Sequence, residues 1–269
     1  MPCLKGFFLR TEKKEYIYFL KLDNRLQKIA DLVPQGVKLA DIGTDHAYLP
    51  AALLMDKKIS FAVAADVAAE PCQVAKTTLA MYGLTQCSEV RQGDGLKVLQ
   101  PDECNCVVMA GMGGSTIVDI LTASPEVAHS VERLILQPMQ GANLLRQFLC
   151  VNGYEFLDEE LVEDGKYLYE IIVVRHRDEG LGHRAEGIGH KEEGLGLRDE
   201  GLGFKVECLI GPKLLEKKHP LLPLQFAKQK AMLNKILRGM ERSGEAVKTE
   251  KYQQCKELLA EVEKWENAC

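Results

Sequence analysis

Residues 39–50, which read LADIGTDHAYLP, decide the fold of this chain. The apolar run that ends at Asp41 is typical of a buried strand, and it leads into a glycine-containing turn and a helix that opens near Pro50. Open α/β sheets bind adenosine-containing cofactors at such a strand–turn–helix junction. On its own the stretch also fits an ordinary strand–turn–helix unit, so its meaning depends on the rest of the chain.

The turn narrows the choice of cofactor. The dinucleotide fingerprint G-x-G-x-x-G is missing, because Asp45 and Ala47 stand where further glycines would let a pyrophosphate approach the backbone. An acidic turn repels phosphate and suits a cation. S-adenosylmethionine carries a sulfonium and an ammonium group, so charge favours it over NAD, and a nucleotide-dependent oxidoreductase is the rival on the same fold.

The pattern of a strand that ends in an acid recurs twice after Asp41. The segment SFAVAAD ends in Asp66, which is placed to accept hydrogen bonds from both ribose hydroxyls. The segment VRQGDG sets Asp94 between Gly93 and Gly95, where its carboxylate can accept from the adenine amino group. Each acid alone is commonly a cap or turn residue. Three of them at successive strand ends predict a cofactor site.

Two more strands and a hairpin complete an α/β pattern. The segment CVVMA runs into Gly111-Met112-Gly113-Gly114, and the segment LILQ stops at Pro138, which cannot continue a central ladder. Helical periodicity separates these strands. Residues 154–162 and 167–174 then read as two strands joined by a Gly-containing turn.

Five motifs together are similar to one enzyme family. They are DIGTDHAYLP at 41–50, RQGDGL at 91–96, AGMGG at 110–114, LILQP at 134–138 and YEI at 169–171. The chain resembles the bacterial tRNA (adenine-N1)-methyltransferases that modify adenine 22, closely over about residues 22–174 and more loosely from about 209 onward. The resemblance implies a class I methyltransferase Rossmann-like sheet followed by an antiparallel helical coiled-coil domain, with S-adenosylmethionine as cofactor and tRNA as substrate.

The candidate site residues lie in these motifs. For chemistry they are Asp45 and His46, which would handle a proton or stabilise a cationic product, and Tyr48, which would stack on the base. Asp45 capping the helix and His46 contacting the cofactor's carboxylate are the structural alternatives. The expected cofactor-binding residues are Asp41, Gly43, Asp66, Gly93, Asp94, Gly95, Ala110, Gly111 and Met112. The family commonly has Gln-Pro-Asn after its fifth strand, and this chain has Met139 in place of the Asn.

The reaction that the resemblance implies is methyl transfer to adenine N1. This nitrogen holds a free lone pair, so the enzyme mainly has to align nucleophile, methyl and sulfur. In a duplex N1 lies inside a base pair, so the base has to be extruded. The Gly111-Met112-Gly113-Gly114 turn replaces the Asn/Asp-Pro-Pro-aromatic motif of many amino-methylating enzymes, which argues against exocyclic amine methylation. A different RNA or a small molecule is the alternative substrate.

Composition places the chain among cytoplasmic proteins with an asymmetric charge. No apolar run is long enough to predict a membrane span, and the nine cysteines form no C-x-x-C pair, so we expect reduced thiols and no metal. The net charge of −5 divides into +4 over residues 205–269 and −9 over the rest. The excess of acidic residues thus lies in the part of the chain expected to bind a cationic cofactor, and the excess of basic residues lies in the C-terminal unit.

Four regions follow from these patterns. Residues 1–20 are expected to be a poorly ordered extension, residues 21–175 the methyltransferase domain, and residues 204–269 the helical coiled-coil domain. Residues 176–203 are four Gly-rich heptads. Two glycines per heptad exclude a stable coiled coil, so we expect a solvated loop rather than a metal site built on its regularly spaced histidines.

The C-terminal unit has the periodicity of two helices joined by a short turn. Its lysines and arginines are typical of a solvated helix face, and the resemblance favours a docking surface for tRNA. A non-catalytic RNA-binding protein would keep this surface and lack the cofactor pocket. The presence of Asp41, Asp66 and Asp94 argues against this alternative. We expect a monomer.

Overall fold

The centre of the protein is a seven-stranded sheet. The computed structural model describes residues 8–10, 16–18, 20–177, 206–243 and 246–268. The strands of the sheet are β3 (Lys38–Ile42), β4 (Phe61–Asp66), β5 (Ser88–Gln92), β6 (Cys106–Met112), β7 (Arg133–Pro138), β8 (Tyr154–Asp164) and β9 (Tyr167–His176).

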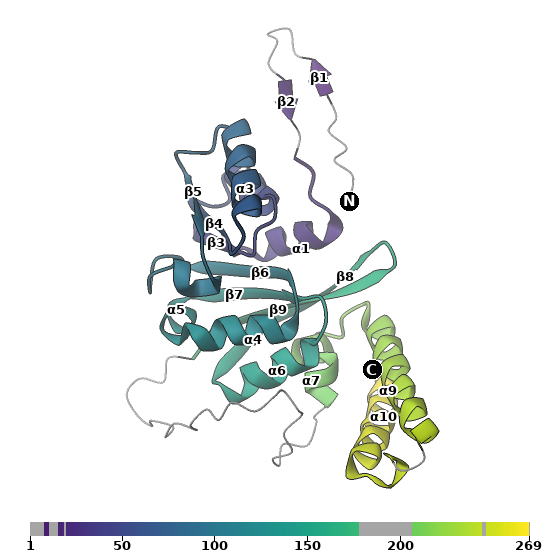
Figure 1. Cartoon of the computed structure of the whole chain (residues 1–269). Helices are drawn as coiled ribbons and strands as arrows, with labels where there is room; N and C mark the ends of the chain where they lie inside the picture. The colour runs from purple at the N-terminus through teal and green to yellow at the C-terminus, as the bar shows by residue number, and fades with distance from the viewer. Residues whose placement is uncertain (1–7, 11–15, 19, 178–205, 244–245, 269) are drawn as a thin grey trace.

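The strand order is β5-β4-β3-β6-β7-β9-β8 (Figure 1). The first five strands of this order are parallel, and the β8–β9 hairpin adds antiparallel to β7. The chain moves outward from β3 to β4 and β5 on one side and returns through β6 to β7 on the other. This reversal makes β3 and β6 the switch point at which open α/β sheets bind ligands. We call the edge at which the parallel strands end the carboxyl edge and the opposite one the amino edge.

Helices cover both faces of the sheet (Figure 1). Neighbouring residues of a strand point to opposite faces, so Leu39 joins the core cluster that contains Leu79, and Ala40 joins the cluster that contains Leu145. One face packs against α1, α2 and α3, and the other against α4, α5 and α6. These helices and the short η1 are α1 (Asn24–Leu32), α2 (Tyr48–Met55), α3 (Ala69–Met81), η1 (Gly95–Val98), α4 (Gly114–Ala123), α5 (Pro125–Ser130) and α6 (Ala142–Val151).

A helix begins near Pro50 as the sequence predicts, and the end of one strand differs from the sequence expectation. Helix α2 begins at Tyr48, before Pro50, because Ala47 adopts left-handed backbone angles (φ 53°) and ends the turn there. Strand β6 continues past Ala110 to Met112 through a bulge at Gly111. A glycine with φ +81° at a bulge lets a strand change direction without ending its pairing.

The region after the sheet is helical, as the periodicity predicts. Its elements are α7 (Val206–Ile210), α8 (Pro212–Glu216), α9 (Leu222–Ser243), η2 (Ala246–Lys248) and α10 (Glu250–Ala268). The two long helices α9 and α10 lie side by side as a hairpin (Figure 1). Leu233 of α9 and Val262 of α10 are buried in one cluster with Leu161 of β8, so the helices pack on each other and on the sheet hairpin.

Two expected regions lie largely outside the described residues. Within residues 1–20, the strands β1 (Phe8–Arg10) and β2 (Tyr16–Tyr18) pair antiparallel. Of the heptad region, the first histidine, His176, is the last residue of β9, and residues 178–203 are not described.

A buried cluster of charges joins the sheet to the C-terminal helices. Arg146 of α6 is fully buried, and its guanidinium donates to Glu159 of β8 at 2.6 Å and to Glu170 of β9 at 2.8 Å. Glu159 also accepts from the backbone N–H of Lys213 in α8, and Glu170 from the ammonium of Lys228 in α9, both at 2.8 Å. Burial alone would raise the pKa of Glu170, but Arg146 and Lys228 outweigh it and lower this pKa.

We predict that Arg146→Met lowers the free energy of unfolding by about 3–5 kcal/mol, because it leaves buried carboxylates without their shared cation. The matched control is Arg175→Met, which breaks an ion pair with Glu155 in which both side chains are at least one-third exposed, and which we expect to cost at most about 1 kcal/mol. Urea unfolding of both variants measures the two effects. Equal destabilisation would show that the buried cluster contributes no more than a surface pair.

Candidate functional site at the carboxyl edge

The turn after β3 is fixed by hydrogen bonds to the next strand. The backbone N–H groups of Gly43 and Thr44 donate to the carbonyl oxygen of Ala65 at 2.8 and 3.0 Å. The buried Thr44 hydroxyl oxygen accepts from the N–H of Ala47 at 3.1 Å. Gly43 has φ +79°, and a Cβ there would lie 2.7 Å from the end of the Met112 side chain. The turn therefore brings backbone from β3 and a side chain of β6 into close proximity.

Asp41 is the buried acid of the site. Its side chain is 8% exposed. Burial raises its pKa to about 6, a hydrogen bond with Thr44 and the charge of Arg25 oppose the rise, and the charge of Asp66 adds to it. The two acids thus lie close enough to repel each other. A cation bound beside them would relieve that repulsion.

The candidate chemical residues form a contiguous group at the start of α2. His46 Nε2 lies 3.1 Å from the Asp45 carboxylate, and the His46 ring stacks on the Tyr48 ring with 5.0 Å between centroids. Asp45 is 78% exposed, and α2 is capped by Ala47 without a side-chain hydrogen bond, so the alternative in which Asp45 caps the helix is wrong. The Nδ1 atom of His46 is buried and has no hydrogen-bond partner in the described structure.

Asp66 and Asp94 stand at the ends of the next two strands and differ in their partners. One carboxylate oxygen of Asp66 accepts from the N–H of Ala68 at 2.7 Å, which fixes the side chain at the start of α3. Asp94 is exposed, and its carboxylate lies 2.6 Å from the ammonium of Lys97. Gly93 donates its N–H to the carbonyl oxygen of Asp66 at 3.0 Å, so the ends of β4 and β5 are joined.

Glycines beside Asp94 are required by close packing. A Cβ at Gly93 would lie 2.5 Å from Val98, and one at Gly95, where φ is +55°, would lie 2.8 Å from Ile120. A larger residue at either position would force Val98 or Ile120 to shift.

The β6 turn is held by a residue of β7 to which the sequence motifs assign no role. Gln137 of β7 is fully buried, and its side-chain oxygen accepts from the N–H of Gly111 at 3.1 Å and from the Arg25 guanidinium at 2.7 Å. Its amide nitrogen donates to the carbonyl oxygen of Pro138 and lies 3.8 Å from the sulfur of Met139. Gln137 lies in the LILQP motif, one of the five that carry the family resemblance. The motif marks the residue, but the strand pattern alone does not predict that its side chain holds the β6 turn.

Arg25 of α1 is a second residue to which the sequence motifs assign no role. Besides Gln137, its guanidinium lies over the Tyr169 ring at 5.7 Å from the centroid and 3.9 Å from the carboxylate of Asp23. Its charge reaches Asp41 and opposes the rise of that pKa. No sequence pattern indicates this contact, because α1 precedes all the motifs and meets them only in the folded chain.

The sheet therefore brings the predicted cofactor residues to one edge. Asp41, Asp66, the Gly93–Gly95 turn and the Ala110–Met112 segment stand at the ends of four adjacent strands. Within the described ranges, no three His, Cys, Asp or Glu side chains gather as metal ligands. In the same part of the chain, no helix has both the length and the apolar character that crossing a bilayer requires.

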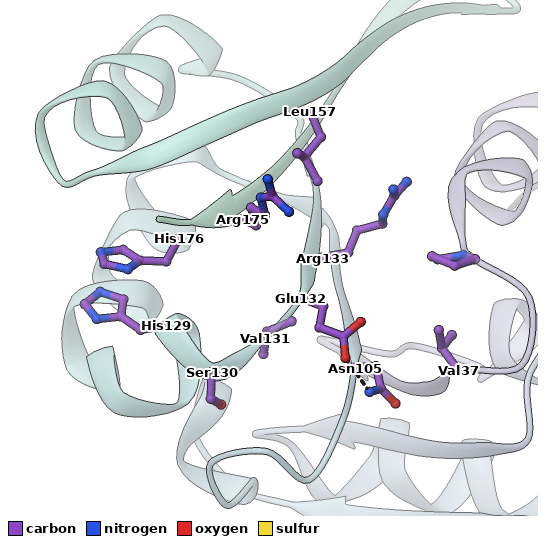
Figure 2. A pocket seen from close by; sticks show the side chains of 11 residues that line it. Val37, Asn105, His129, Ser130, Val131, Glu132, Arg133, Leu157, Arg175 and His176 are labelled. Atoms are coloured by element: carbon purple, nitrogen blue, oxygen red, sulfur yellow. Dashed lines mark hydrogen bonds between the residues drawn. The ribbon is translucent and has the colours of Figure 1, made fainter. Parts of the chain in front are cut away.

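A separate cavity of about 420 Å³ lies at the amino edge (Figure 2). It is lined by residues that precede β3 and β6, begin β7 and end β9, among them Val37, Asn105, Arg133 and His176. The His176 ring stacks on the His129 ring at 3.6 Å between centroids. This cavity faces away from the acids of the carboxyl edge and is a different site from the one that the motifs predict.

Comparisons with known proteins show the family to which the chain belongs. A family model for a methyltransferase domain matches residues 22–172. The tRNA (adenine(22)-N(1))-methyltransferase of Bacillus subtilis (strain 168) is 40% identical over 159 residues, which are 59% of this chain and 67% of that protein. This chain belongs to the tRNA (adenine-N1)-methyltransferase family. The family resemblance read from the five motifs is confirmed, and the oxidoreductase interpretation is set aside.

Solved structures agree over nearly the whole chain. The crystal structure of the Bacillus subtilis m1A22 tRNA methyltransferase TrmK is 31% identical and covers 93% of this chain and 99% of its own, with a TM-score of 0.72. The structure of Streptococcus pneumoniae Sp1610 in complex with S-adenosyl-L-methionine is 29% identical in sequence. It covers 89% of this chain and 100% of its own, with a TM-score of 0.68. The predicted methyltransferase sheet with a helical C-terminal region is thereby confirmed.

Asp41 gives a prediction about pH that needs no ligand. Its folded pKa of about 6 lies above the ordinary value of 3.8. The folded state therefore holds the proton more tightly, and its stability falls as the pH rises between these two values. Replacement by Asn removes this pH dependence. Between pH 4 and 7.5 we expect the free energy of unfolding of Asp41→Asn to gain about 2 kcal/mol relative to wild type.

Urea unfolding at several pH values measures this difference. Asp119→Asn, at an exposed position of α4, serves as the control and should keep a constant offset from wild type. A constant offset for Asp41→Asn as well would mean that Asp41 is not buried as an unfavourable charge.

Proposed function

We propose that this protein transfers a methyl group from S-adenosylmethionine to N1 of adenine 22 in tRNA. The observation that carries the proposal is the row of acids at the carboxyl edge of a sheet that belongs to this methyltransferase family. The curated Bacillus subtilis relative carries that activity in its name, and the Streptococcus pneumoniae structure holds S-adenosyl-L-methionine. A class I methyltransferase that acts on another RNA or on a small molecule is the alternative.

The carboxyl edge fits a cationic, adenosine-containing cofactor. Asp41 carries a raised pKa because it is buried near Asp66, and a positive group beside it would stabilise its ionised form. Asp66 would accept from the ribose hydroxyls, and Asp94 would exchange its contact with Lys97 for the adenine amino group. Gly111, held by Gln137, would let the backbone approach the cofactor. When bound, S-adenosylmethionine supplies an electrophilic methyl group.

The group at the start of α2 would receive the target base. Adenine N1 needs no strong base, so the residues here orient and stabilise rather than deprotonate it beforehand. Tyr48 and His46 present stacked rings for the extruded base. The methylated adenine carries a positive charge, which the exposed carboxylate of Asp45, 3.1 Å from His46, would stabilise.

The C-terminal helices would dock the tRNA. Lys228 lies on these helices, and its ammonium pairs with Glu170. Lys230 likewise pairs with Glu266. Other exposed basic side chains have no carboxylate partner in the described structure and remain available for phosphates. They include Lys235, Arg238, Lys251 and Lys256. The monomeric state and the cytoplasmic location stay predictions.

The direct test is incubation with methyl-labelled S-adenosylmethionine and unmodified tRNA, followed by nucleoside analysis. We expect label in 1-methyladenosine, and no label when adenine 22 of the tRNA is replaced by guanine. Label in another nucleoside, or label that persists after the replacement, would favour the alternative substrate.

For the cofactor we predict that Asp66→Ala weakens S-adenosylmethionine binding by about 1.5–3 kcal/mol, the range of hydrogen bonds to a charged group. Asp66→Asn keeps one oxygen that can accept from Ala68 and should weaken binding less. Calorimetry of the folded variants gives both affinities. Unchanged affinity in Asp66→Ala would remove Asp66 from the ribose role.

For docking we predict that replacing Lys235, Arg238, Lys251 and Lys256 with Gln weakens tRNA binding and leaves S-adenosylmethionine binding unchanged. The log–log salt dependence of tRNA binding should flatten by about 0.7–0.9 for each phosphate that the variant no longer neutralises. Lys57→Gln and Lys76→Gln, at exposed positions of the sheet domain, serve as controls for charge alone. The same salt slope in the fourfold variant and wild type would show that tRNA docks elsewhere.

A further inference from the structure

The β8–β9 hairpin projects past the carboxyl edge. Leu136 of β7 pairs with Ile172 of β9, and β7 ends at Pro138, whereas antiparallel β9 begins earlier in the chain at Tyr167. The first residues of β9 therefore lie beyond the end of β7. In Figure 1 the hairpin reaches out between α1 and α9. It thus stands between the candidate site and the C-terminal helices.

The two faces of this hairpin have different neighbours. On one face, Leu161 and Leu168 pack with the cluster of the C-terminal helices, and Lys228 of α9 donates to the carbonyl oxygen of Leu168 at 3.2 Å. On the other face, Ile171 joins the core cluster that includes α1. Because side chains two residues apart share a face of a strand, Tyr167 and Tyr169 lie on the face of Ile171.

The two tyrosines form a platform that leads to the site. Tyr167 is 55% exposed, and its ring centroid lies 5.9 Å from that of Tyr169 at an interplanar angle of 41°. The ammonium of Lys166 lies 5.3 Å from the Tyr167 centroid. On the inner side, Arg25 covers the Tyr169 ring at 5.7 Å and donates to Gln137, which holds the β6 turn.

An aromatic ring this exposed, with a cation beside it, has a known use in RNA recognition. Tyr154, by contrast, packs in the core with 5% of its surface exposed. Proteins that bind single-stranded or unpaired nucleotides combine aromatic faces for the bases with cations for the backbone. Tyr167 and Lys166 offer this combination at the side of the site that faces the docking helices.

We propose that Tyr167, supported by Tyr169, stacks on a tRNA base that neighbours the target adenine, and that Lys166 contacts the adjoining phosphate. This inference rests on the proposed function, because it assumes a tRNA whose target base leaves its helix. Extrusion of one base unstacks its neighbours. The platform replaces that stacking and holds the strand while the target adenine reaches Tyr48.

The test compares Tyr167→Ala and Tyr167→Phe in the full chain. Tyr167→Ala should weaken tRNA binding by about 5- to 150-fold, the range for removal of one base–aromatic stack, whereas Tyr167→Phe keeps the ring and should bind as wild type does. The salt slope should stay at the wild-type value in Tyr167→Ala and fall by about 0.7–0.9 in Lys166→Gln. Thermal unfolding and S-adenosylmethionine binding should be unchanged in all three variants, which separates stacking from a structural role.

A fluorescent base gives a readout that does not depend on activity. With 2-aminopurine placed at position 21 or 23 of the tRNA, wild type and Tyr167→Phe should quench the probe at one of the two positions, and Tyr167→Ala should not. Equal binding, methylation and quenching by wild type and Tyr167→Ala would overturn the platform alone. A wild-type enzyme that forms no 1-methyladenosine would overturn the proposed function and this inference with it.

Discussion

Parallel pairing of β3 with β4 and with β6 makes neighbouring strands end at one edge, and the candidate site depends on this constraint. Asp41, Asp66 and Asp94 are separated by helices in the chain, yet the register places them on adjacent strand ends. Burial of Asp41 near Asp66 leaves a local excess of negative charge. A cationic cofactor offsets this charge, which a pyrophosphate would increase.

The buried charges around Arg146 impose a second constraint. Glu159 and Glu170 lie on the two strands of the hairpin, and each also accepts from a residue of the C-terminal helices. The hairpin is therefore held from the sheet side by Arg146 and from the helix side by Lys213 and Lys228. Within this joint, removal of Arg146 would leave Glu159 and Glu170 buried without their shared cation, which is costly.

Local features of this structure could be predicted from the sequence. A strand end with an acid and a glycine is visible in consecutive residues, so the sequence alone predicts the Asp41 and Asp94 turns and the β8–β9 hairpin. Contacts between distant segments leave no such pattern. Arg25 reaches Gln137 across the sheet edge, Arg146 meets two strands that follow it, and Lys228 has the sequence context of any exposed lysine.

We propose that the cofactor binds at the carboxyl edge. The most direct measurement is a crystal structure of the full chain with S-adenosylhomocysteine. We expect the ribose hydroxyls on the Asp66 carboxylate, the adenine beside Asp94, and the amino-acid part of the ligand between Asp41 and Gly111. Ligand density in the amino-edge cavity beside Arg133 and His176, with none at the carboxyl edge, would contradict it.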